Sequence, residues 1–140
     1  MATLTASGVI CPGYMFDTHA LYWHWTAPAR LPTAVRDIIA AAGIGEAHIV
    51  VSHVVLAEMY FLFRKLDCAE HFAPRIAELQ SSGAFQLEPL LLADIEQLPH
   101  FEAVPEMHDR LLVIQALRLN IPLVTKDASI HQSSAVTCIW

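Results

Sequence analysis

Hydrophobic and polar positions along the 140-residue chain follow two alternating patterns. Short apolar runs, rich in β-branched and aromatic residues, have the length of buried strands. Longer segments repeat their apolar residues with the helical period and have the length of helices. The predicted strands are residues 14–16, 47–52, 85–90, 122–125 and 135–140. The predicted helices are residues 32–45, 53–66, 69–83, 91–98 and 107–120.

Capping and helix-breaking residues agree with these boundaries. Ser52 stands directly before a helical segment and is a natural N-cap, and Pro32 is expected in the first turn of its helix. Pro74 should lie in a first turn or kink its helix. Asn120 and Pro122 are expected to end the last long helix.

Strands that alternate with helices at this spacing predict an α/β fold, a three-layer α/β/α sandwich with a central parallel sheet. Helices on both faces of the sheet would account for the 55% of residues that are hydrophobic. One domain is expected over residues 14–140, after an N-terminal extension, residues 1–13, whose order the sequence leaves open. In such folds, ligands bind beyond the carboxyl ends of the strands.

The net charge of −6 argues against a protein that holds nucleic acid on a broad basic surface. It does not exclude a nuclease whose acidic site is filled by cations. No Lys or Arg lies between Arg75 and Arg110, an interval that is rich in acids. This interval is either a solvated acidic face, the simpler interpretation, or a docking region for a basic partner. Its acidic residues are Glu78, Glu88, Asp94, Glu96, Glu102, Glu106 and Asp109.

Neither a membrane span nor a disulfide framework is indicated. No apolar run reaches the roughly 18 residues that suggest a bilayer-spanning helix, and the first residues lack the basic start of a signal peptide. We therefore expect a cytoplasmic protein without membrane association. Cys11, Cys68 and Cys138 are odd in number and widely spaced, so reduced, partly buried thiols are expected.

Four acidic residues from distant parts of the chain are predicted to converge. Asp17 ends the first strand and Asp127 follows the strand at 122–125, so both belong to the binding edge of the sheet. Helices that return antiparallel to the strands begin at the same edge. Asp109 would lie in a first turn, and Glu58 roughly one and a half turns into its helix. Glu106, three residues before Asp109, is a further candidate.

Each of these acids also has a purely structural interpretation. Asp17 and Asp127 could serve only as N-caps, and Asp109 could serve only to stabilise a helix dipole. Glu58 is harder to explain in this way, because the surrounding segment VVLAEMYFLF is apolar on nearly every side. An isolated carboxylate there would carry a large desolvation cost, so Glu58 needs a partner.

A divalent cation is the partner that fits all four acids. Lys126, beside Asp127, could reach only one or two of them. Converging carboxylates repel one another, whereas a bound divalent ion keeps them ionised. Oxygen ligands favour Mg²⁺ or Mn²⁺ over zinc or copper. Such a site suits phosphodiester hydrolysis, because the metal activates water and stabilises charge on the reacting oxygens.

The same residues lie in four stretches, MFDTHALYW, SHVVLAEM, EMHDRLLVIQALRLNIPLVTKD and the final CIW. Together, in this order and spacing, they resemble the PIN domain, specifically the small VapC-type toxin ribonucleases of bacterial and archaeal toxin–antitoxin systems. The resemblance covers about residues 14–140. It implies that Asp17, Glu58, Asp109 and Asp127 are the catalytic, metal-binding acids and that the Thr125 hydroxyl assists water or phosphate positioning.

The family further implies Mg²⁺- or Mn²⁺-dependent cleavage of RNA and inhibition by a cognate antitoxin protein. An antitoxin tail carrying Arg could insert a guanidinium among the carboxylates, while its helix covers apolar surface around ALYWHW or MYFLF. A homodimer is expected from the mean hydropathy of +0.44. The chain departs from many relatives at Glu106, where Asp-Pro-x-Asp is replaced by Glu-Met-His-Asp, and in the residues before 14.

Other candidate groups carry weaker signals. The eight histidines lack a metal-binding spacing, although His19 and His108 stand beside predicted ligands and could orient a carboxylate or contact substrate. Arg110 could contact phosphate or pair with Asp109. Three aromatic residues could stack on an RNA base or pack against the core or another chain. They are Tyr22, Trp23 and Trp25.

The leading hypothesis is therefore a metal-dependent endoribonuclease that acts as the toxin of a toxin–antitoxin pair. The alternative is a catalytically silent PIN-like module that binds RNA or protein. A phosphoacceptor receiver domain is disfavoured, because it would need adjacent acids after the first strand and a Lys-Pro near the end.

Overall fold

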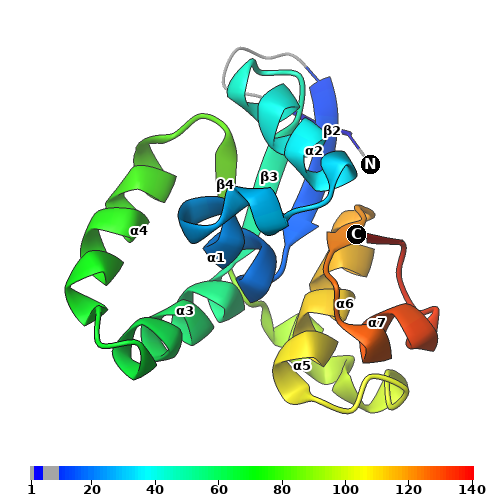
Figure 1. Cartoon of the computed structure of the whole chain (residues 1–140). Helices are drawn as coiled ribbons and strands as arrows, with labels where there is room; N and C mark the ends of the chain where they lie inside the picture. Colours follow the sequence, from blue (N-terminus) through cyan, green and yellow to red (C-terminus); the bar gives the residue numbers. More distant parts are fainter. Residues whose placement is uncertain (1, 5–9) are drawn as a thin grey trace.

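The computed structural model describes residues 2–4 and 10–140. Five parallel strands form the central sheet in the order β4-β3-β2-β5-β6, and β1 pairs antiparallel with the first half of β2 (Figure 1). The predicted α/β/α class, with a parallel sheet flanked by helices, is confirmed. The strands are β1 Ala2–Leu4, β2 Ile10–Phe16, β3 His48–Ser52, β4 Phe85–Glu88, β5 Leu123–Val124 and β6 Cys138–Ile139.

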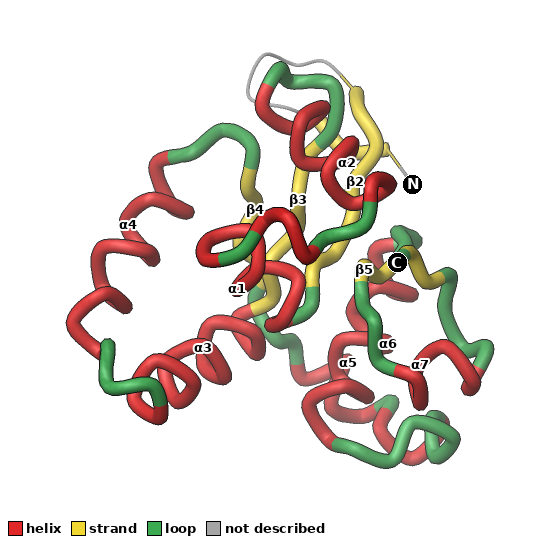
Figure 2. Tube along the Cα trace, in the orientation of Figure 1, coloured by secondary structure: helices red, strands yellow, loops and turns green. Residues whose placement is uncertain are grey.

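Seven α-helices accompany the sheet in the described part of the chain. Figure 2 shows α3 and α4 as a hairpin that projects to one side, while α5, α6 and α7 gather on the other. Three 3₁₀ turns, Pro28–Arg30, Ala69–His71 and Leu98–His100, link the helices. The helices are α1 Thr18–Thr26, α2 Thr33–Gly43, α3 His53–Lys65, α4 Phe72–Ser81, α5 Leu92–Glu96, α6 Met107–Leu119 and α7 Ala128–Ser133.

The core is formed by elements that are buried along their whole length. Every residue of β3 is buried, as expected for a strand covered on both faces. Gly13 of β2 lies so close to β3 that an added Cβ would fall 2.7 Å from the His48 ring, which favours glycine at this position. The middle of α6, from Leu111 to Ala116, is also buried. None of the helices in the described residues has the length and apolar character needed to cross a membrane.

The predicted positions of Ser52, Pro74 and Asn120 are confirmed, whereas Pro32 lies one residue before the helix in which it was expected. The Ser52 side chain accepts a hydrogen bond from the Val54 amide at 3.0 Å and begins α3. Asn120 ends α6 in the left-handed conformation with φ 53°. Pro74 is the third residue of α4 and so lies in its first turn. Pro32 stands immediately before α2, as its N-cap.

The start of the sheet differs from the prediction. β2 begins at Ile10, four residues before the predicted strand, because Ile10, Cys11 and Pro12 pair with β1. Residues 10–13 therefore belong to the sheet and not to an extension. The sequence pattern also did not predict α1 or α7 as separate helices, although Asp17 and Asp127 were recognised as potential N-caps.

Candidate active site

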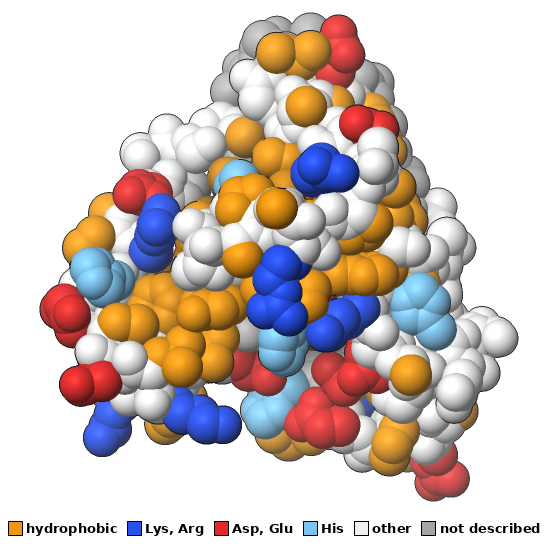
Figure 3. Space-filling view, viewed as in Figure 1, with side chains coloured by type: hydrophobic (Ala, Val, Ile, Leu, Met, Phe, Trp, Pro, Cys, Tyr) orange, Lys and Arg blue, Asp and Glu red, His pale blue; other side chains and the backbone are white. Residues whose placement is uncertain are grey.

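A cleft of about 480 Å³ opens at the carboxyl edge of β2 and β5. The four predicted acids come from separate elements and all line it, together with Glu106. In the space-filling view, red carboxylates gather below two blue cationic side chains in the middle of this face (Figure 3). The convergence expected from the topology is therefore present. The lining residues are Asp17, Thr18, His19, Glu58, Glu106, Asp109, Leu112, Lys126, Asp127 and Ala128.

Asp17 is the most buried of the four acids. It is the N-cap of α1 and accepts a 2.8 Å hydrogen bond from the Ala20 amide and a 2.5 Å bond from the Thr125 hydroxyl. Burial raises the pKa of Asp17, and the two hydrogen bonds offset part of that rise. Its position is thus fixed by both the helix that it starts and the end of β5.

The Thr125 hydroxyl holds two of the acidic segments together. It donates to Asp17 and accepts a hydrogen bond from the Asp127 amide at 3.1 Å, and its side chain is fully buried. Its single proton is committed to Asp17. Thr125 is not among the residues that line the cleft, and its hydroxyl positions Asp17; the expected help of this hydroxyl in positioning water or phosphate stays a prediction.

Asp127 is the N-cap of α7, and its carboxylate ionises readily. Burial acts to raise the pKa of Asp127, but hydrogen bonds from the Ser129 hydroxyl at 2.6 Å and the Ile130 amide at 3.1 Å outweigh it and lower the pKa. The lowered pKa provides a permanent negative charge at one side of the cleft.

Asp109 and Glu58 have the opposite electrostatic character. Burial, with repulsion from Asp127 and Glu106 among others, raises the pKa of Asp109 to about 7. Its carboxylate accepts no hydrogen bond from the described residues. Glu58 accepts a 3.1 Å bond from the Thr18 hydroxyl, and burial raises its pKa. This environment disfavours the ionised forms of both acids, and a bound cation would stabilise those forms.

Glu106 has a clear local role as the N-cap of α6. It accepts a 2.7 Å bond from the Asp109 amide and pairs with His108 at 2.6 Å. Burial alone would raise the pKa of Glu106, but these bonds lower it. The pKa of His108 is raised in spite of burial, chiefly because Glu106 stabilises its charged form. His108 thus orients a carboxylate, as the simpler interpretation expected.

The family model of the PIN domain matches residues 14–134 of the chain. The chain belongs to the PIN domain family. Its match covers every acid of the cleft, so the residues described above lie within the family's own domain. A search of curated proteins finds no match.

Solved structures show the same fold. VapBC2 from Rickettsia felis, bound to a DNA fragment from its promoter, matches with a TM-score of 0.71 and 16% identity over 91% of this chain and 98% of the other. DNA-bound VapBC from Salmonella typhimurium gives a TM-score of 0.70 and 12% identity, covering 91% and 97%. VapBC-1 from nontypeable Haemophilus influenzae gives a TM-score of 0.64 and 18% identity, covering 91% of this chain and 96% of the other.

One predicted contact of this PIN domain does not form. Arg110 follows Asp109 in α6, but its guanidinium donates to the carbonyl oxygens of Val104 at 2.7 Å and Leu98 at 3.1 Å. Arg110 neither lines the cleft nor pairs with Asp109 among the described residues. The helical turn directs its side chain toward the 3₁₀ segment before α6, where it anchors that loop.

The three aromatic residues of α1 pack within the PIN domain. Trp23 is 7% exposed and lies against Trp140, with ring centroids 5.6 Å apart. Tyr22 and Trp25 both contact the ring of Phe63. Their surfaces are therefore used in packing, which removes the reason to assign them to base stacking. His19, by contrast, is exposed and lines the cleft.

Two features of the site had no sequence signal. Thr18 lies within the MFDTHALYW stretch, but nothing in the sequence indicated that its hydroxyl holds Glu58. Arg30 and Lys126 both approach the indole of Trp23, at 4.0 and 4.4 Å from its centroid. Such contacts depend on how three chain segments meet in space, and residue spacing does not report that.

The donor set of the PIN domain fits a hard divalent cation. No three Asp, Glu, His or Cys side chains of the described residues form a ready-made metal cage. Mg²⁺ does not require one, because it usually keeps several waters and binds one or two carboxylates plus phosphate oxygens. The acidic side chains in the cleft offer carboxylate oxygens, His19 adds an imidazole to the lining, and none of the four acids forms an ion pair within the described residues.

Proposed function

We propose that this PIN domain is a divalent-metal-dependent endoribonuclease and the toxin of a toxin–antitoxin pair. The observation that carries the proposal is the convergence of Asp17, Glu58, Asp109 and Asp127 in one cleft, where none of them forms an ion pair within the described residues. Membership of the PIN domain family supports nuclease activity. The fold shared with VapBC structures is consistent with the toxin role.

The four acids of the cleft would have different roles, which follow from their charge states. Asp17, Asp127, Asp109 and Glu58 would hold Mg²⁺ or Mn²⁺, which supplies an activated water and stabilises charge on the phosphate oxygens. Asp127, with its lowered pKa, offers a charge before the ion arrives. Asp109, with its pKa of about 7, would release its proton as the ion binds. Thr125 and Thr18 keep Asp17 and Glu58 aimed at the cleft.

A partner protein fits the exposed apolar surface of α3. The MYFLF segment presents Phe61, which is 66% exposed, and Tyr60, which is 36% exposed, whereas the ALYWHW segment is largely buried or half-buried. An antitoxin helix would cover this surface and place an arginine among the carboxylates. Co-expression with the protein encoded immediately upstream tests this proposal, with one affinity tag on each chain, and recovery of this chain alone would refute it.

A homodimer would use another surface. Leu92 and Ile95 of α5 are 73% and 44% exposed, and such apolar side chains are usually covered by a partner when they cluster. Light scattering that gives a single-chain mass at all concentrations would exclude the dimer.

Cleavage of single-stranded RNA by the purified protein tests the enzymatic proposal. We expect cleavage with Mn²⁺, none after chelation, and a loss of roughly 100-fold or more in Asp17→Asn. Asparagine keeps the N-cap of α1, so the fold should persist. Asp37→Asn, at an exposed position of α2, is the matched control and should cleave like the natural protein.

Two results would contradict the enzymatic proposal. One is equal cleavage by Asp17→Asn and the natural protein, which would indicate a contaminating nuclease. The other is RNA binding without cleavage under any divalent ion, which would favour the silent module.

A further inference from the structure

Two cationic side chains share one indole at the rim of the acidic cleft. The guanidinium carbon of Arg30 lies 4.0 Å from the Trp23 ring centroid, and Nζ of Lys126 lies 4.4 Å from it. Trp23 itself is held firmly, because it is 7% exposed and packs on Trp140. Cation–π attraction restrains both flexible side chains, which lowers the entropy cost when they bind a ligand.

Neither cation uses its hydrogen-bond donors within the described residues. Arg118, by comparison, is occupied by Asp94 at 2.7 Å and Glu88 at 3.0 Å, and Arg110 is occupied by backbone carbonyls. The side chains of Arg30 and Lys126 form no ion pair or hydrogen bond in the described structure, and both are exposed. Their charged groups therefore remain available to an anion from outside.

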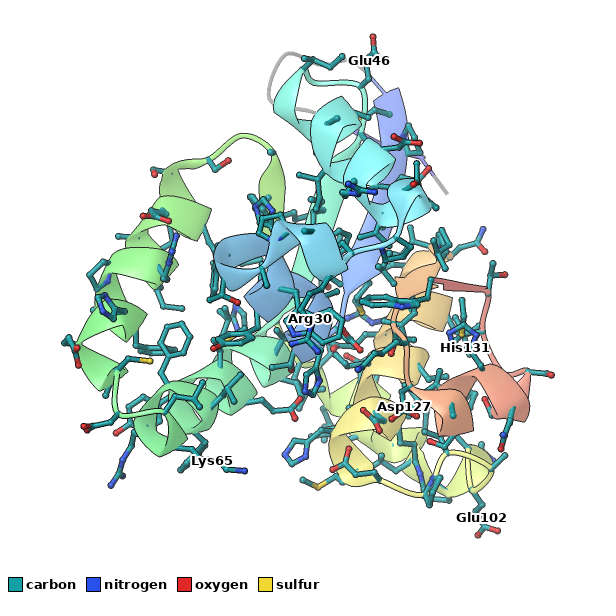
Figure 4. All side chains as sticks on the ribbon, viewed as in Figure 1. Arg30, Glu46, Lys65, Glu102, Asp127 and His131 are labelled. Atoms are coloured by element: carbon teal, nitrogen blue, oxygen red, sulfur yellow. The ribbon has the colours of Figure 1, made fainter. Side chains whose placement is uncertain are left out.

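The two cations lie on the route into the carboxylates. Lys126 lines the cleft beside Asp127, whereas Arg30, at the end of the Pro28–Arg30 turn, is not among the lining residues. In Figure 4, Arg30 stands on the same face as Asp127, above it in the view. The rim is thus positive where the interior is negative. A polyanion that reached the cleft would meet the cations first.

The distances also limit what the pair can bind. Because the two charges lie 4.0 and 4.4 Å from one centroid, they are no more than about 8.4 Å apart. At this upper limit or below it, both cations can contact the same short stretch of one strand that crosses the rim.

We propose that Arg30 and Lys126, restrained by Trp23, bind neighbouring backbone phosphates of a nucleic-acid strand and guide it into the acidic cleft. The inference rests on the proposed nuclease function, since it assigns how the substrate strand is held next to the carboxylates. The contacts are to phosphate, so they confer affinity and direction without selecting a sequence.

Binding of labelled single-stranded RNA, followed by fluorescence anisotropy in Ca²⁺ buffer at several salt concentrations, tests this proposal. We expect Arg30→Gln and Lys126→Gln each to weaken binding by about three- to tenfold at moderate salt. Each should also reduce the slope of log K against log salt by about 0.7. Lys126→Arg should restore most of the affinity.

Lys65→Gln is the charge-matched control. Lys65 is exposed at the end of α3, and Figure 4 shows it at the lower edge of the molecule, away from Asp127. It should bind within about twofold of the natural protein, because a distant exposed charge is largely screened. Circular dichroism melts establish that all variants are folded.

Several outcomes would overturn the proposal. One is an Arg30→Gln, Lys126→Gln double variant whose affinity and salt slope are unchanged. Another is a natural protein that binds no strand. A third is a loss of affinity in the variants that appears with RNA but not with DNA of the same sequence. The last would mean that the contacts are not to the shared phosphate backbone. Failure of the nuclease proposal looks different, because the natural protein would then bind RNA in a manner dependent on Arg30 and Lys126 but leave it intact with Mn²⁺.

Discussion

Asp109 shows at the scale of one residue how the cleft is prepared for a cation. Its carboxylate is half-buried, receives no hydrogen bond from the described residues and faces Asp127, Glu106, Glu58 and Asp17, so its pKa rises to about 7. An ordinary structural aspartate in a first helical turn would have a lowered pKa, because the helix dipole favours its charge. The structural interpretation of Asp109 therefore explains less than the functional one.

This pKa predicts how stability changes with pH when metal is chelated. An unfolded aspartate ionises near its ordinary pKa of 3.8, whereas folded Asp109 keeps its proton until about pH 7. Between these values the folded state binds more protons, so the contribution of Asp109 to stability falls as pH rises and levels off above about 7. The raised pKa values of Asp17 and Glu58 act in the same direction.

We therefore expect Asp109→Asn to be more stable than the natural protein at about pH 8 in chelator, by about 1 kcal/mol given the partial solvent screening. The advantage should shrink toward pH 5. Urea titrations at the two pH values measure it. Asp37→Asn, exposed on α2, should show no such pH-dependent gain. A destabilised Asp109→Asn at pH 8 would mean that the carboxylate is not repelled by its neighbours.

At the scale of the elements, local rules predicted the parts that build the site. Ser52 and Asn120 carry strong cap preferences, so the limits of α3 and α6 followed from the sequence. Asp17 stands directly after β2 and Asp127 stands three residues after the end of β5, and parallel topology then brings them to one edge. The four acids were predictable for this reason.

Other elements could not be read from local pattern. β1 forms by antiparallel pairing with β2, which hydrophobic period does not reveal. α7 has six residues, too few to show a helical period, and α1 is dominated by aromatic residues with weak helix preference. The direction of Arg110 and the pairing of Arg30 and Lys126 with Trp23 depend on tertiary contacts between separate segments.

A buried glutamine connects the elements that carry Glu58 and Asp109. Gln115 of α6 is fully buried, accepts a 2.5 Å hydrogen bond from Ser52 before α3, and donates to the Pro89 carbonyl at 3.2 Å. Gln115→Leu keeps the volume but leaves both partners unsatisfied, so we expect a loss of about 2–3 kcal/mol in unfolding free energy. Denaturant titration measures it.

Gln80→Leu provides the comparison, because Gln80 is exposed on α4 and should change stability by no more than about 0.5 kcal/mol. Equal stability of the two variants would show that the link between α6 and α3 is unimportant.

At the scale of the whole molecule, the positions of the charged side chains matter more than the net charge. The net charge of −6 would oppose nucleic acid everywhere on the surface. The structure concentrates carboxylates in one cleft and leaves Arg30 and Lys126 at its rim. A divalent ion would neutralise part of the negative charge of the interior, so a polyanion would then be repelled less on its way into the cleft.

The central claim is that these four carboxylates together hold the ion, and calorimetric titration with Mn²⁺ at about pH 7.5 tests it most directly. We expect the natural protein and Asp37→Asn to bind Mn²⁺ alike, with proton release on binding. Asp17→Asn, Asp109→Asn and Asp127→Asn should each weaken binding by roughly tenfold or more. Undiminished Mn²⁺ binding by these three variants, or no binding by the natural protein, would contradict the account.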